Sequence, residues 1–187
     1  MSPMPTAGLG AALVLLAALF FSPLYACQSS VPDAVEAPVR SRGEPVLFSF
    51  PPAGADSEVS SESTRGRVTA LLFITMFDIA SQVTARRLGE VLVKLTPRAN
   101  AAAVVIEPPL YVELLPTYRD SLSLPYPVVM ADYATQSGTG PFGDIGHVPT
   151  LVILDREGRE TFRHQGPLEP DEIEDALRRA GDRRPGG

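Results

Sequence analysis

The sequence predicts an α/β protein with a central β-sheet of mixed strand direction and helices on both faces. Two apolar runs, at 68–77 and 101–107, are too continuous for half-exposed strands and indicate central strands that are covered on both sides. A helical pattern at 79–95 separates them, and the chain closes with a strand, a turn, a second strand and a helix. This order of elements predicts one domain.

The first elements precede the 68–77 run. A strand is expected at 46–50, where side chains alternate, and Pro51 and Pro52 end it. Residues 53–66 are polar and small, which predicts a surface loop with room for one short edge strand.

The helix at 79–95 is predicted by residues that recur at three- and four-residue spacing while charged residues fall elsewhere: Ala80, Thr84, Leu88, Val91 and Leu95. Thr96-Pro97 ends it. After the next strand, Pro108-Pro109 opens a second helix that Pro116 must end or kink.

The last third of the chain predicts a short strand at 126–130 and, from its many Gly and Pro residues, irregular structure at 137–150. Strands at 150–154 and 160–165 flank a turn at 155–158 and form a hairpin. The final helix begins at Pro170, has acidic residues in its first turn and arginines in its last, and is expected to end before Gly181.

The N-terminus predicts a lipid anchor. The apolar stretch from Gly8 to Phe21 is shorter than the roughly 20 residues of a membrane-spanning helix, as expected for a signal peptide. It leads to Leu24-Tyr25-Ala26-Cys27, which resembles the lipobox of bacterial lipoproteins, in which the Cys is lipidated and becomes the new N-terminus. Residues 1–26 contain no Lys or Arg, so an uncleaved N-terminal anchor is the alternative.

These signals divide the chain into a signal peptide at 1–26, a tether rich in Pro, Ser and charge at 27–44, a domain at 45–181 and a tail at 182–187. The expected location is outside the cytoplasm, and Gln28 after the lipidated Cys favours the outer membrane, facing the periplasm.

The composition and the absence of known motifs argue against several classes of function. The formal charge of −6 provides no large basic surface for nucleic acid. The sequence has no phosphate-binding loop, no His-Glu-x-x-His helix and no dinucleotide fingerprint, so no cofactor is expected.

Three stretches stand out in order along the chain: Gly66-Arg67-Val68 leading into the apolar run, Gly146-His147-Val148-Pro149-Thr150, and the turn at 155–158. Together they resemble the thioredoxin-like fold, in particular the extracytoplasmic thioredoxins of the TlpA/ResA kind. The resemblance implies that Val148-Pro149 is the family's cis-proline loop, which faces the redox pair. Together the stretches cover about residues 44–180.

The same resemblance reveals a departure. In FITMFDIASQ, an aromatic residue, Phe77, is followed by Asp78 and Ser81 where the family has its two redox cysteines. Thiol–disulfide exchange requires a thiolate that attacks a disulfide sulfur, which a carboxylate cannot replace. Cys27 is the only cysteine and is assigned to lipidation. No catalytic residue is therefore expected.

The same residues could have other roles. Asp78 is expected to cap the helix, and Ser81 to satisfy an amide or to lie exposed. An Asp78, Ser81 and His147 constellation could be hydrolytic, because His147 is the one base available to Ser81. Asp78 and His147 with Asp144 or His164 could hold a metal.

The sequence favours a lipid-anchored accessory protein of the cell envelope without catalysis. It would bind a peptide or protein in a groove around Phe77, Asp78, Ser81, His147 and Val148-Pro149. A divergent member of the family that acts in a redox pathway through a partner, and a metal-binding accessory protein, remain the alternatives.

Overall fold

A computed structural model describes residues 43–52, 58–96 and 98–182. All of these belong to one compact unit that spans Glu36–Gly187. The predicted signal peptide, Cys27 and most of the tether lie outside the described residues, as do 53–57 and the tail from 183. The fold below is that of the described residues alone.

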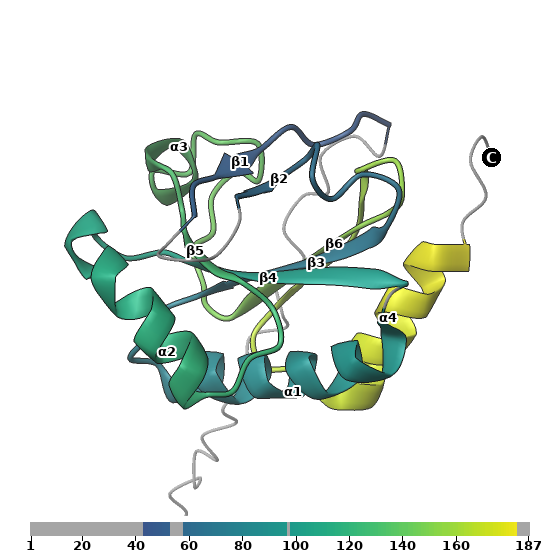
Figure 1. Cartoon of the computed structure of the whole chain (residues 1–187). Helices are drawn as coiled ribbons and strands as arrows, with labels where there is room; N and C mark the ends of the chain where they lie inside the picture. Colours follow the sequence, from purple (N-terminus) through teal and green to yellow (C-terminus); the bar gives the residue numbers. More distant parts are fainter. Residues whose placement is uncertain (1–42, 53–57, 97, 183–187) are drawn as a thin grey trace, which may run out of the picture. The chain divides into compact units, whose positions relative to one another are not determined.

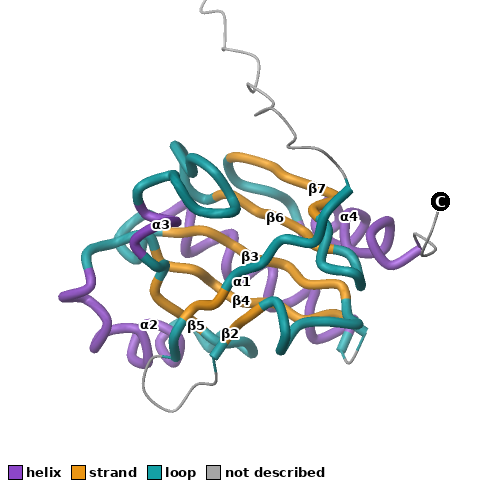
Figure 2. The backbone as a smooth tube through the Cα atoms, turned by 90° about the horizontal axis from the view of Figure 1, so that it is seen from above, coloured by secondary structure: helices purple, strands orange, loops and turns teal. Residues whose placement is uncertain are grey.

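A five-stranded sheet of order β5-β4-β3-β6-β7 forms the centre, as Figure 2 shows from above. Its strands are β3 (Val68–Ile74), β4 (Ala99–Val105), β5 (Val128–Met130), β6 (Thr150–Leu154) and β7 (Glu160–Gln165). The first three run parallel, whereas β6 is antiparallel to β3 and β7 is antiparallel to β6. The mixed sheet predicted from the apolar runs is confirmed.

A separate pair of short strands, β1 (Ser49–Phe50) and β2 (Val59–Ser60), runs antiparallel. β2 is the edge strand expected in the polar segment. The predicted strand at 46–50 is regular only in its last two residues.

The helices are distributed unevenly over the two faces of the sheet. They are α1 (Ile79–Leu95), the 3-10 segment η1 (Pro109–Leu114), α2 (Leu115–Ser121), the one-turn α3 (Tyr133–Gln136) and α4 (Pro170–Asp182). Figure 1 shows α1, α2 and α4 below the sheet, and β1, β2 and α3 above it.

Several predicted boundaries need correction. The helix expected after Pro108-Pro109 is the 3-10 segment η1, which begins at Pro109 and ends at Leu114, just before Pro116. The unexpected part is that α2 follows at once with Pro116 as its second residue, where the ring removes an N–H that has no partner. Gly181 lies inside α4, not beyond it. The 68–77 run leaves the sheet after Ile74, and α3 was not predicted.

Two hydrophobic clusters follow from the alternation of side chains along β3. Ala70, Leu72 and Ile74 face α1 and α4 and join the larger cluster. Leu71 and Phe73 face the opposite side and join the smaller cluster. There the ring centroid of Phe142 lies 5.1 Å from that of Phe73 and 5.5 Å from that of Phe48. Both faces of the central strand are therefore buried, as the continuous apolar run requires.

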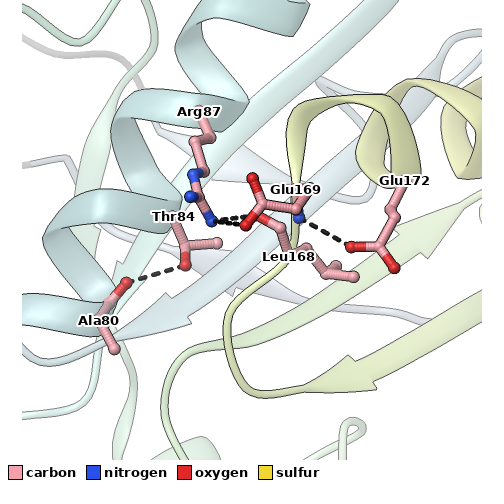
Figure 3. Close-up of polar contacts among 6 residues, drawn as sticks. All are labelled: Ala80, Thr84, Arg87, Leu168, Glu169 and Glu172. Carbon is pink, nitrogen blue, oxygen red and sulfur yellow. Dashed lines mark hydrogen bonds and ion pairs between the residues drawn. The ribbon is translucent and has the colours of Figure 1, made fainter.

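A polar link fastens α1 to the start of α4 (Figure 3). Arg87 Nη1 donates to the Leu168 carbonyl at 3.0 Å and pairs with the Glu169 carboxylate at 2.9 Å. The Glu172 carboxylate accepts from the Glu169 N–H at 2.8 Å, which satisfies a donor that the start of α4 leaves open. This link sets the spacing of two helices beneath the same end of the sheet.

Among the described residues, no helix has the length and apolar character needed to cross a membrane.

Candidate functional site

Asp78 is the N-cap of α1, as expected. Its backbone is extended, with φ −91° and ψ 126°, and its carboxylate accepts from the Ser81 N–H at 2.6 Å. The pKa of Asp78 is lowered, first by the Ser81 hydroxyl, which lies beside the carboxylate but outside hydrogen-bonding geometry, and then by the Ser81 N–H. Asp78 is therefore a stable anion at the positive end of a helix.

Ser81 differs from its prediction. Its side chain is fully buried, and its Oγ makes no hydrogen bond within the described part of the chain. The reason is its place on the inward stripe of α1, which continues through Thr84, Ala85 and Leu88 against the sheet. Ser81 is thus neither exposed nor an amide acceptor, and no base is hydrogen-bonded to it as a nucleophile would require.

The Val148–Pro149 peptide bond is cis, as the resemblance implied. Thr150 pairs with Phe73 in the sheet, so this loop lies at the end of β3, where Met76 to Asp78 follow. The Pro149 carbonyl accepts from the Gly166 N–H at 2.7 Å, and the His147 carbonyl from the Thr150 hydroxyl at 2.6 Å. Neither the N–H nor the C=O of Val148 has a hydrogen-bond partner among the described residues.

Phe77 is the exposed aromatic residue of the site, with 69% of its surface accessible. Its ring meets that of Tyr111 edge-on, at a centroid distance of 5.8 Å. Ile79 is 77% exposed, whereas Met76 is buried at 4%. The apolar surface here, called the Phe77 patch below, consists of Phe77, Ile79 and Tyr111, and Met76 does not contribute to it.

Glu107 and Gln82, which the sequence analysis did not single out, hold the Met76 peptide from both sides. A Glu107 carboxylate oxygen accepts from the Met76 N–H at 3.0 Å, and Gln82 Nε2 donates to the Met76 carbonyl at 2.8 Å. Burial raises the pKa of Glu107, and the Met76 hydrogen bond opposes that effect. Glu107 follows β4, and Asp78 follows β3. Because the carboxyl ends of parallel strands lie at the same edge of a sheet, the position of Glu107 after an apolar strand could have identified it as a residue of this site.

Tyr118 lies near this carboxylate. Burial raises its pKa to about 12, with a second contribution from the charge of Glu107 and a third from Asp78. Its hydroxyl and the second Glu107 oxygen are buried without a hydrogen-bond partner in the described chain. Buried polar groups of Glu107 and Tyr118 therefore lie close to the Met76 backbone that leads to Phe77.

The metal alternative is not supported by this geometry. No group of three or more His, Cys, Asp or Glu side chains in the described ranges is placed to hold a metal ion. Asp78, His147, Asp144 and His164 are all described and do not form such a group.

The fold and site together define a class. A mixed sheet of this order, with a cis-proline loop before β6 and a helix that begins just after β3, is the thioredoxin-like fold. This confirms the fold expected from the sequence.

Solved structures similar to this chain are thiol–disulfide oxidoreductases. A thiol:disulfide interchange protein from Chlorobium tepidum has 17% identity and a TM-score of 0.61, over 73% of this chain and 94% of that one. A DsbF homologue from Corynebacterium diphtheriae has 13% identity and a TM-score of 0.63, over 72% of this chain and 85% of that one.

A secreted disulfide oxidoreductase from Mycobacterium tuberculosis has 13% identity and a TM-score of 0.58, over 71% of this chain and 96% of that one. No protein-family model matches the chain, and no curated protein matches it significantly. The similarity therefore establishes the fold, and the single cysteine of the sequence is consistent with a domain that has lost the redox reaction.

Proposed function

We propose that this protein is a lipid-anchored, extracytoplasmic thioredoxin-like domain that binds an extended segment of another protein and catalyses no reaction. The binding surface consists of the Phe77 patch and the Val148–Pro149 loop. Asp78 stands there as a helix cap.

The observation that carries the proposal is the unpaired backbone of Val148. A peptide N–H and C=O at the edge of a fold are satisfied by water or by an extended chain that adds to the edge. The exposed ring of Phe77 lies at the same end of the sheet and offers apolar contact to a side chain of that segment. Main-chain pairing beside an aromatic contact is suited to a peptide ligand.

The chemistry of the site supports a binding role over catalysis. Asp78 is committed to the Ser81 N–H, and the Ser81 hydroxyl is buried away from any ligand. A nucleophile must reach its substrate and be activated by a neighbouring base, and Ser81 meets neither condition.

Two observations support the location. The Leu24-to-Cys27 sequence has the form of a lipobox, and one similar structure is that of a secreted oxidoreductase. A lipid on Cys27 would hold the domain at a membrane surface, with the outer membrane favoured by Gln28.

The test is photo-crosslinking of the lipidated protein in its native membrane, with a photoreactive residue at 77. The matched control carries it at 93, because Val93 is also apolar, lies on α1 and has 67% of its surface exposed, compared with 69% for Phe77. We expect one dominant protein adduct from 77 and none of the same mass from 93. Equal adduct patterns from both sites would contradict the proposal.

A further inference from the structure

A cavity of about 290 Å³ lies at the end of the sheet opposite to the Phe77 patch. Val68 and Ala99, the first residues of the parallel strands β3 and β4, line it, whereas Asp78 and Glu107 follow the other ends of these strands. The last turns of α1 and α4 and the turn between β6 and β7 complete its wall. No residue of the proposed peptide-binding surface takes part.

The floor of the cavity is apolar. Val68 and Leu177 are each 3% exposed, and Leu95 is half-buried beside them. Gly181 keeps this space open, because a Cβ there would touch only the Val68 side chain, at 3.6 Å, and a longer side chain would extend into the cavity.

The rim of the cavity is cationic. Arg98 and Arg156 are exposed, and within the described residues neither side chain has a hydrogen bond or an ion pair. The third arginine of the rim, Arg178, is paired with Glu174 one turn earlier in α4. Among the described residues that line the cavity, Asp182 is the one acidic side chain, so this part of the rim has two unpaired guanidinium groups and one carboxylate.

We infer that this cavity is a binding site for a small amphipathic carboxylate. Guanidinium groups pair with carboxylates through charge-assisted hydrogen bonds. An apolar tail attached to that carboxylate would cover Val68, Leu95 and Leu177. A cavity of this size is at the lower limit of small-molecule pockets, which favours a single short chain over a larger ligand.

The arginines also have a simpler role, because helix C-termini attract cations and two helices end here. If the arginines had only this role, the binding of a small molecule would not depend on the shape of the apolar floor. A ligand site requires both the charge of the rim and the open space beside Gly181, and the two can be changed separately.

The experiment is titration of the full chain with octanoate, followed through the NMR signals of Val68, Ala99 and Leu177. Octanol supplies the tail without the charge, and acetate the charge without the tail. We expect octanoate to shift these signals and to bind at least tenfold more tightly than either analogue, since an ion-paired hydrogen bond and the apolar contact each contribute about a factor of ten.

The variants separate rim from floor. Arg98→Ala with Arg156→Ala is expected to weaken octanoate at least tenfold, and Gly181→Leu, which suits a helix better than Gly, to abolish binding while the fold is retained. Arg179→Ala is the control, because Arg179 is exposed on the same turn of α4 without lining the cavity. Equal binding of octanol and octanoate, no shift with octanoate, or an equal loss in Arg179→Ala would each overturn the inference.

Discussion

Glu107 accepts a hydrogen bond from the backbone N–H of Met76 at 3.0 Å, and this contact joins the segments that follow two neighbouring parallel strands. Gln82 donates to the carbonyl of the same residue. The peptide that leads to Phe77 is therefore held on both sides, which fixes where the exposed ring emerges. The site is positioned by polar contacts from α1 and from the segment that follows β4.

The first prediction concerns pH and Glu107. Because burial raises its pKa above the ordinary value of 4.5, the native state holds the proton more tightly than the unfolded state. Its contribution to stability is thus present at low pH and is lost as pH rises through the raised pKa. Glu107→Gln keeps an oxygen for the Met76 N–H, so the free energy of unfolding of the variant relative to the parent should increase between pH 4 and pH 8.

Chemical denaturation across this pH range measures the effect. Glu113→Gln is the control, because Glu113 is an exposed glutamate in the nearby η1 segment. A difference that does not change with pH would contradict the assignment of a raised pKa to Glu107.

The second prediction concerns the cap of α1. Asp78→Ala should lower the free energy of unfolding by about 1 kcal/mol, since the Ser81 N–H would lose its acceptor. Asp78→Ser should lower it less. The pKa of Asp78 is lowered, so the stabilisation is present above the ordinary value of 3.8 and is lost as pH falls through the lowered pKa.

Urea denaturation at pH 7 and at acid pH tests the cap. The Ala variant should approach the parent in stability as the pH falls. A deficit that remains constant down to the lowest pH at which the protein is folded would contradict the role of the carboxylate charge.

The third prediction separates surface from core at two phenylalanines. Phe77→Ala should change the free energy of unfolding by less than about 0.5 kcal/mol, because the ring is largely exposed. Phe73→Ala should cost about 3–5 kcal/mol, because that ring is fully buried against Phe142. Thermal and denaturant unfolding measure both, and a large loss in Phe77→Ala would mean that the Phe77 patch is structural.

Much of this fold was predictable because its signals are local. The helix at 79–95 has both a capping Asp and a stripe of residues at three- and four-residue spacing, and its predicted bounds are those observed. The hairpin strands at 150–154 and 160–165 were likewise confirmed residue for residue. Strand ends in the parallel part of the sheet were less accurate, because the register between β3 and β4 decides them and no turn marks it.

The site was predictable in its backbone but less so in its side chains. The cap at Asp78 was predicted and found. The Val148–Pro149 bond is cis where the resemblance implied a cis-proline loop, although a Val-Pro pair alone does not specify its isomer. The burial of Ser81 and of Met76, and the contact of Phe77 with Tyr111, depend on how α1 and η1 pack together. A sequence pattern does not specify this packing. It also does not predict the role of Glu107, whose hydrogen bond to the Met76 N–H joins residues 31 positions apart.

The proposed function depends on Asp78 and Ser81 occupying the places of a redox pair. The most direct test replaces both, Asp78→Cys with Ser81→Cys, in a Cys27→Ala background, and counts free thiols by mass spectrometry after mild oxidation. The extended backbone at Asp78 turns its side chain back over the first helical turn, as the 2.6 Å contact with the Ser81 N–H shows. A disulfide needs Cβ atoms about 3.5–4.5 Å apart, which this geometry favours.

The control pair is Glu90→Cys with Val93→Cys, also three residues apart but inside α1, where Cβ atoms are about 5–6 Å apart. We expect the 78/81 pair to lose both thiols on oxidation and to recover them with reductant, while the 90/93 pair keeps its thiols. If the thiols at 78 and 81 remain free under conditions that oxidise a thioredoxin, these residues do not stand at a former redox site.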